Sequence, residues 1–149
     1  MTIHQYIFTY GLKPADAIVM KKKLFGMVDH YVIYLGVYNN EHKFVANYSS
    51  GVQVISHFEL RKFLQYLSPS KIERYPGPEH LRSNAVQRAL SRINEKAYDY
   101  LGNNCEHFKN WVHRGVHKSE QVENLKEGAI FMLGTFAVAG FLDAIFYQE

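Results

Sequence analysis

The stretch LGNNCEHFKNW, residues 101–111, contains the single cysteine of the chain and has the pattern of a helix start. Two asparagines precede Cys105, and Gly115 follows it. An asparagine at a helix start accepts hydrogen bonds from the free N–H groups of the first turn, and glycine is common just past a helix end. The stretch therefore predicts a helix over residues 105–114 that one of the two asparagines caps.

A cysteine in the first turn of a helix is a candidate nucleophile. The free N–H groups and the positive end of the helix dipole favour the thiolate, so we predict a lowered pKa for Cys105. The same N–H groups can hold an oxyanion, and a nearby imidazole would serve as general base. The alternative is that Cys105 is a small buried hydrophobic residue, which is the usual role of a lone cysteine.

The residues before this helix predict strands and further helices. Aromatic and β-branched residues in HYVIYLGVY, residues 30–38, are typical of a strand, and the turn sequence NNEH leads to a hairpin partner over residues 43–49. Apolar residues at helical spacing predict one helix over residues 57–67 and a longer one over 83–101, which Gly102 ends. For the remaining segments we predict strands at residues 17–20 and 52–56, and a proline-rich loop at 68–78 with room for a strand at 71–75.

Composition places the chain among ordinary globular proteins. Its 149 residues suffice for one domain with a core, and 47% of them are hydrophobic against 21% charged. A single cysteine excludes an intramolecular disulfide and fits a reducing compartment. A net charge of +3 is weak support for nucleic-acid binding but allows attraction to anionic lipid headgroups. We therefore expect no nucleic-acid partner. The first residues lack the pattern of a secretory signal, so we expect a cytoplasmic protein.

The C-terminal part of the sequence differs from the rest. Residues 128–146 are apolar apart from Thr135 and Asp143, and their number is close to the roughly 20 residues that cross a bilayer. This pattern predicts an apolar helix, either a membrane anchor or a helix buried in the core or in a homodimer interface. We therefore expect a domain over residues 1–127 followed by this segment, residues 128–149.

Eight histidines accompany the cysteine, and His30 is the best candidate partner. It opens the strand over residues 30–38, and a histidine at a strand end faces a site edge readily. His107 is a poor partner, because a residue two positions after Cys105 on a helix points about 200° away. The other histidines outside the 39–42 turn lie in contexts typical of the surface or of turns; they are His4, His57, His80, His113 and His117.

A structural zinc site is an alternative for the cysteine. Cys105 with His107, His113 and His117 supplies four potential ligands of the two types that zinc prefers. Cys105 and His107 cannot converge on one ion from a regular helix, and the glycine at 115 separates the last two histidines. We therefore expect no metal and no cofactor.

Two motifs together resemble a known family. HYVIYLG, followed much later by NCEHF, resembles the lecithin–retinol acyltransferase family and its relatives, the phospholipase/acyltransferases related to the H-Ras-like suppressors. KPADAIVM and KSEQVENL also resemble family segments, so the likeness covers residues 12–125. It implies an α+β, circularly permuted papain-like fold, with a small antiparallel sheet packed on helices. It also implies that Cys105 is acylated by a phospholipid ester, with His30 as base.

The third catalytic position departs from the family pattern. Family members usually carry a second histidine on the next strand, and FVANY places Asn47 there. His42 is the rival, because its separation from His30 is the usual one in the family, although it falls in the NNEH turn. We prefer Asn47, since the surrounding strand matches and an amide oxygen can accept the imidazole N–H.

The resemblance implies a lipid acyltransferase or phospholipase, whose substrate lies at a membrane surface. The C-terminal segment lies outside the resemblance, and from its apolar composition we expect it to supply membrane association. Two alternatives stay open. One is a catalytically weak or inactive binding or regulatory protein of the H-box/NC type found in some viruses. The other is a papain-like amidase or peptidase.

Overall fold

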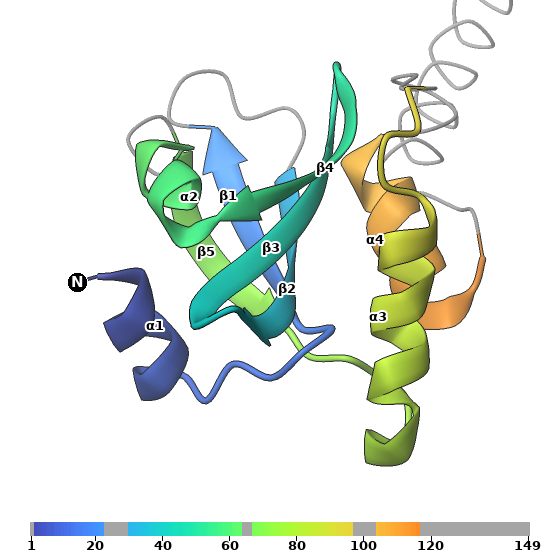
Figure 1. Ribbon diagram of the computed structural model, residues 1–149, viewed down its shortest axis with the longest axis horizontal. Coiled ribbons are helices and arrows are strands. Elements are labelled where there is room, and N and C mark those ends of the chain that lie inside the picture. The colour runs from blue at the N-terminus through green and yellow to red at the C-terminus, as the bar shows by residue number, and fades with distance from the viewer. Residues whose placement is uncertain (1, 23–29, 64–66, 97–103, 117–149) are drawn as a thin grey trace, which may run out of the picture. The chain divides into compact units, whose positions relative to one another are not determined.

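The computed structural model describes residues 2–22, 30–63, 67–96 and 104–116, and within them an α+β fold (Figure 1). A five-stranded antiparallel sheet has the order β4-β3-β2-β1-β5. Its strands are β1 (Ala17–Lys22), β2 (His30–Tyr38), β3 (Glu41–Tyr48), β4 (Gly51–Ser56) and β5 (Leu67–Glu73). The helices are α1 (Ile3–Thr9), α2 (His57–Phe63), the 3₁₀ turn η1 (Glu79–Leu81), α3 (Arg82–Ser91) and α4 (Cys105–Arg114).

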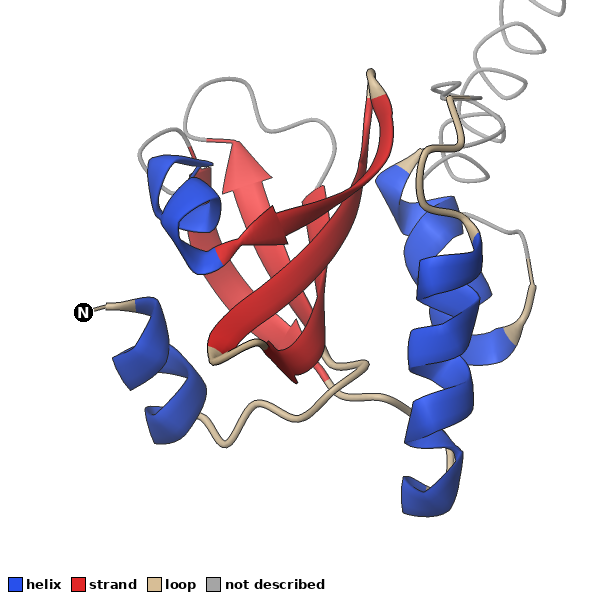
Figure 2. Ribbon diagram, viewed as in Figure 1, coloured by secondary structure: helices blue, strands red, loops and turns tan. Residues whose placement is uncertain are grey.

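Helices cover both faces of the sheet, so there are two hydrophobic cores (Figure 2). Side chains alternate along a strand, and β2 therefore contributes to each core. Tyr31, Ile33 and Leu35 pack with α3 and α4 in what we call the α4-side core, which also contains Cys105. Val32 and Tyr34 pack with α1 and α2 in the α1-side core. A residue on β2 or β3 is thus assigned to one layer or the other.

The β2–β3 hairpin is tighter than predicted. Asn39 and Asn40 alone form the turn, both with positive φ (52° and 59°), and β3 begins at Glu41. Asparagine tolerates this left-handed conformation, and a turn of two such residues matches the twist of the strands. The prediction that His42 lies in the turn is wrong, because His42 is a strand residue paired with Val37.

The strand after α2 is longer than predicted and begins earlier. A loop with room for a strand at 71–75 was expected at residues 68–78, whereas β5 runs from Leu67 to Glu73 along the edge beside β1. Pro69 lies in this strand, where the pairing with β1 shifts register between Val19 and Met20. Proline is compatible with an edge strand or a bulge because it lacks only the N–H donor. The structure describes α2 over His57–Phe63; residues 64–66 of the predicted helix lie outside the described residues, and its last predicted residue, Leu67, belongs to β5.

Helix α3 ends at Ser91, ten residues before the predicted end at 101. Asn94 adopts φ 69°, its N–H donates to Val52 O (2.9 Å), and the N–H of Val52 donates to Glu95 O (2.9 Å). The chain therefore leaves the helix to pair with β4. Gly51 permits this approach, because a Cβ there would lie 2.3 Å from Glu95 O.

A buried carboxylate joins three segments at the edge of the α4-side core. Asp16, which has no exposed side-chain surface, accepts hydrogen bonds from Arg74 Nη1 and Arg82 Nη1, each at 2.8 Å. The backbone N–H groups of Lys13 and Tyr75 also donate to it. Burial alone would raise the pKa of Asp16, but the hydrogen bonds from Tyr75, Arg82, Arg74 and Lys13 hold it below its ordinary value.

The predicted C-terminal helix over residues 128–146 lies outside the described residues, as does the predicted domain boundary at 127. The described elements all lie within residues 1–119, the first of two units into which the chain divides. Among the residues that the structure describes, no helix is long and apolar enough to cross a membrane.

Candidate active site around Cys105

Cys105 is the first residue of α4, and Asn104 caps that helix. The Asn104 side-chain oxygen accepts hydrogen bonds from the N–H groups of Glu106 (2.9 Å) and His107 (3.1 Å). The His107 ring reaches back to the backbone N–H of Asn104 (3.4 Å), which completes a capping box. Of the two candidate caps, Asn103 lies outside the described residues. The cap and the αL residue Gly115 together fix both ends of this helix.

The Cys105 side chain is buried, with 1% of its surface exposed. Backbone N–H groups of Tyr31, Cys105 and Glu106 donate toward its sulfur. The pKa of the thiol is raised to about 11: burial is the largest cause and the Glu106 carboxylate adds to it, whereas the three N–H groups act in the opposite direction. The predicted lowered pKa is therefore wrong, because desolvation of the thiolate outweighs stabilisation by the helix N-terminus.

The raised pKa of Cys105 predicts that both the reactivity of its thiol and the stability of the protein change with pH between about 9 and 11. The rate of Cys105 alkylation by iodoacetamide should rise with pH to an inflection near 11, against an ordinary value of 9.0. Between these pH values the unfolded chain has lost the thiol proton and the native state still holds it. The native protein should therefore lose about 3 kcal/mol of stability across that window relative to Cys105→Ala. Denaturant unfolding of both proteins at pH 8, 10 and 11 measures the difference, and an alkylation inflection below 8.5 would contradict it.

His30 is the first residue of β2, and its side chain is partly exposed. It pairs in register with Met20 of β1. The next residue along the chain, Tyr31, supplies the strand N–H that meets the Cys105 sulfur. The structure thus brings the start of β2, where His30 lies, to the first turn of α4.

The two rivals for the third position lie on opposite faces of the sheet. Asn47 is buried, and its Nδ2 donates to the carbonyl oxygen of Asn104 (3.4 Å), the residue before Cys105. His42 lies in the other layer, hydrogen-bonded to Tyr34 Oη (2.8 Å) and to the His4 ring (3.1 Å). The structure therefore places Asn47, and not His42, beside the cysteine helix.

The family model for lecithin retinol acyltransferase matches residues 11–118. The chain belongs to the lecithin retinol acyltransferase family. The match runs from the loop before β1 past the end of α4, so it includes both motifs that carry the resemblance. The predicted membership of this family is thereby confirmed. No curated protein and no solved structure matches the chain. Membership implies a papain-like fold and indicates an acyltransferase or phospholipase type of function.

Sequence reasoning missed several polar residues on the buried face of α4 in this family member. His113 was assigned to the surface or a turn, but it is buried, and its Nε2–H donates to Ala15 O (2.8 Å). Burial lowers the pKa of His113, which keeps the ring neutral. Lys109 is buried on the same face, and positions 105, 109 and 113 share that face at intervals of four. The interval of four was visible in the sequence, but lysine and histidine are polar, so these positions were not predicted to form a buried face.

Among the residues described, no group of three or more His, Cys, Asp or Glu is placed to hold a metal ion, and His117 of the zinc alternative is outside them.

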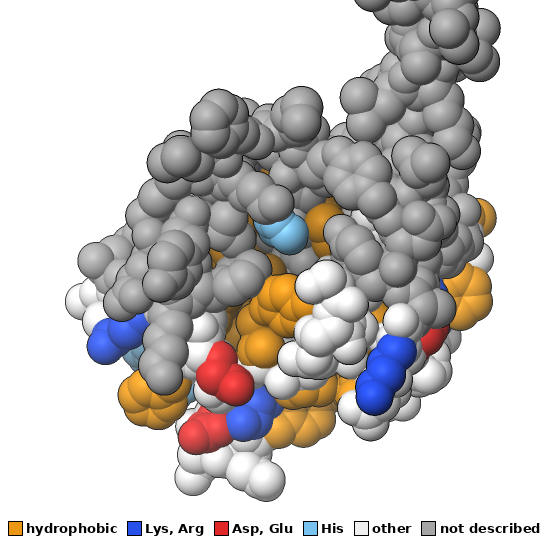
Figure 3. All heavy atoms as spheres, turned by 90° about the horizontal axis from the view of Figure 1, so that it is seen from above, with side chains coloured by type: hydrophobic (Ala, Val, Ile, Leu, Met, Phe, Trp, Pro, Cys, Tyr) orange, Lys and Arg blue, Asp and Glu red, His pale blue; other side chains and the backbone are white. Residues whose placement is uncertain are grey.

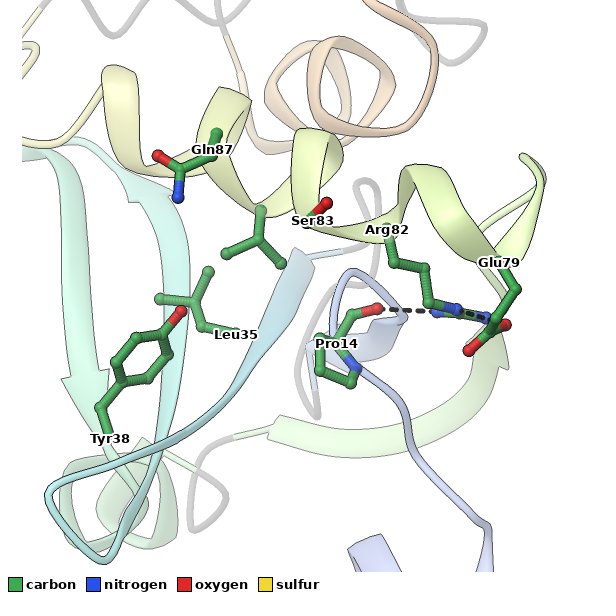
Figure 4. A pocket seen from close by; sticks show the side chains of 8 residues that line it. Pro14, Leu35, Tyr38, Glu79, Arg82, Ser83 and Gln87 are labelled. Atoms are coloured by element: carbon green, nitrogen blue, oxygen red, sulfur yellow. Dashed lines mark hydrogen bonds and ion pairs between the residues drawn. The ribbon is translucent and has the colours of Figure 1, made fainter.

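A cavity of about 390 Å³ lies apart from Cys105. It opens where β2 ends and α3 begins, and Figure 4 shows its wall. Its lining is Pro14, Leu35, Tyr38, Glu79, Arg82, Ser83, Val86 and Gln87. Figure 3 shows hydrophobic side chains and a histidine at the surface of the face viewed from above.

Proposed function

We propose that the protein is a thiol acyltransferase or phospholipase acting on the acyl esters of glycerophospholipids. The observation that carries the proposal is the Cys105 thiol at the first turn of α4, met by three backbone N–H groups within the family-matched region. The fold would be the circularly permuted papain-like type, since the histidine strand precedes the cysteine helix in the chain.

In the proposed first step the Cys105 sulfur attacks the ester carbonyl carbon, and His30 takes the thiol proton. A base is needed because the thiol, with a pKa of about 11, is protonated at neutral pH. The carbonyl oxygen becomes an oxyanion, which N–H groups at the start of α4 would stabilise. When the oxyanion collapses, the lysophospholipid oxygen leaves with the proton from His30. The acyl thioester then passes its acyl group to an alcohol, an amine or water.

Asn47 is proposed to complete the site by orienting the His30 ring. Asn47→Ala should lower the rate of Cys105 acylation about a hundredfold, because a small misplacement of a reacting group has effects of that size. Asn47→His should be tolerated, since the family uses histidine there. His42→Ala, on the other face of the sheet, should leave the rate nearly unchanged. Single-turnover acylation rates of the three variants decide this, and the reverse pattern would return the role to His42.

One observation favours a second candidate function. A thiol that is 99% buried with a raised pKa is what an inert structural cysteine looks like. A catalytically weak or inactive binding or regulatory protein of this family would keep such a thiol.

Mass spectrometry of the intact protein separates the two candidates. After incubation with a mixed phospholipid dispersion, the enzyme should gain the mass of a fatty acyl chain. Cys105→Ala should gain none, and hydroxylamine should release the adduct from the native protein. No gain under any lipid composition would support the binding protein. The same gain in Cys105→Ala would show that another residue is acylated.

We also propose that residues 128–146 bring the site to a membrane surface, since phospholipid esters lie at the headgroup boundary. A chain ending at Glu127 should lose binding to sedimented liposomes while it still acylates Cys105 from detergent-dispersed lipid. Unfolding of the shortened chain at a much lower temperature would instead assign the segment to the core or to a homodimer interface.

A further inference from the structure

Helix α4 places a lysine on its buried face one turn after Cys105. Lys109 is 8% exposed, and its Nζ lies 3.0 Å from Glu73 Oε2 at the end of β5. The same Nζ lies over the ring of Tyr31, 4.7 Å from the ring centroid. The three side chains come from α4, β5 and β2, and the proposed mechanism uses none of them.

Stability does not explain the lysine. Removing a lysine and a carboxylate from water costs several kcal/mol, and their attraction offsets roughly that amount. An apolar side chain of similar volume at position 109 would serve the core as well or better. Burial raises the pKa of Glu73, but hydrogen bonds from Lys71 and Lys109 outweigh it, so the carboxylate stays ionised beside Lys109.

The contact with Tyr31 connects this pair to the reacting sulfur. Tyr31 is the residue whose backbone N–H donates toward Cys105, and its ring is buried in the α4-side core. An ammonium over an aromatic face restrains the ring, and the Glu73 carboxylate restrains the ammonium. A shift of the ring would move the N–H on the same residue.

We propose that Lys109 is a positioning residue: anchored by Glu73, it holds Tyr31 so that the Tyr31 N–H stays against the Cys105 sulfur. The inference rests on the proposed function only in taking Cys105 as the reacting group. It deepens that function by adding Lys109, Glu73 and Tyr31 to the residues that set the reactivity of the thiol.

The test uses the rate of Cys105 alkylation by iodoacetamide in the full chain, which requires no lipid. Lys109→Met should slow alkylation at pH 9 about three- to tenfold, because the thiolate loses a fixed hydrogen-bond donor. Lys109→Arg should restore most of the rate, since arginine keeps both the cation and the ion pair. Lys13→Met, which breaks an exposed pair with Glu79, is the matched control and should change nothing.

Two further measurements separate positioning from a structural role. Tyr31→Leu should slow alkylation as Lys109→Met does, and the double variant should be no slower than either single variant. Lys109→Met combined with Glu73→Gln should melt at or above the native temperature yet remain slow. Three results would each overturn the inference. They are rate losses that add in the Tyr31→Leu, Lys109→Met double variant, an unchanged alkylation rate in Lys109→Met, and rate losses that follow the melting temperature across the variants. Failure of the native protein to form an acyl adduct would refute the proposed function and leave these alkylation rates to decide the role of Lys109.

Discussion

Asp16→Asn should remove about 3–5 kcal/mol from the free energy of unfolding, because it breaks a buried ion pair and leaves Arg82 with only the exposed Glu79 carboxylate as its counter-charge. Asp16 has no exposed surface and is shared by Arg82 of α3 and Arg74 after β5, each 2.8 Å away. Asparagine keeps the shape of the side chain but presents one NH₂ group to these guanidinium groups. The loop before β1, the end of β5 and the start of α3 would lose their common contact.

Urea denaturation at pH 7 measures this loss. Glu79→Gln is the control, because the Glu79 side chain is mostly exposed and its pairs should contribute less than about 1 kcal/mol. The pKa of Asp16 is lower in the folded than in the unfolded state. Its contribution to the free energy of unfolding is therefore full above the unfolded pKa and is lost as the pH falls from there through the lower, folded pKa. The difference between the native protein and Asp16→Asn should therefore shrink below about pH 4. A pH-independent difference would assign the loss to packing rather than to charge.

His30→Ala should slow Cys105 acylation about 10²- to 10⁴-fold, the usual contribution of a general base. The effect should be large because a thiol with a pKa of about 11 has almost no thiolate at neutral pH. The fold should be little affected, since His30 is a partly exposed residue at a strand end. Single-turnover acylation followed by mass spectrometry, beside a thermal melt, gives both quantities.

His107→Ala is the matched control for His30→Ala. Its ring completes the capping box with Asn104, so its loss should cost about 1 kcal/mol of stability and little in rate. A large rate loss in His107→Ala together with an active His30→Ala would show that His107 is the base.

Local signals in the sequence were enough for some elements. Helix α4 begins at Cys105 and ends at Arg114, as predicted, because the asparagine cap and Gly115 both act within a few residues. Strand β2 also has its predicted bounds, since its apolar run is bounded by turn residues. Helix α1 was not predicted, although Thr2 and Gln5 form a capping box that the sequence contains.

Other features depend on contacts that no local pattern contains. Helix α3 stops at Ser91 because the following chain pairs with Val52, more than forty positions earlier in the sequence. The raised pKa of Cys105 comes from burial under the sheet, whereas the sequence showed only the helix start. Lys109 and His113 were hidden because a charged or polar residue on a helix usually indicates the exposed face.

The two outer strands of the sheet bear on how the chain avoids aggregation. An open strand edge pairs readily with the edge of another molecule, and folded proteins block such pairing with prolines, charges or covering chain. At β4 the backbone of Val52 is already paired with residues 94 and 95. At β5 the edge carries Pro69, which has no N–H to donate, and the charged pair Lys71–Glu73. The proline that made this segment resemble a loop is thus also one of the residue types that limit edge-to-edge pairing of sheets.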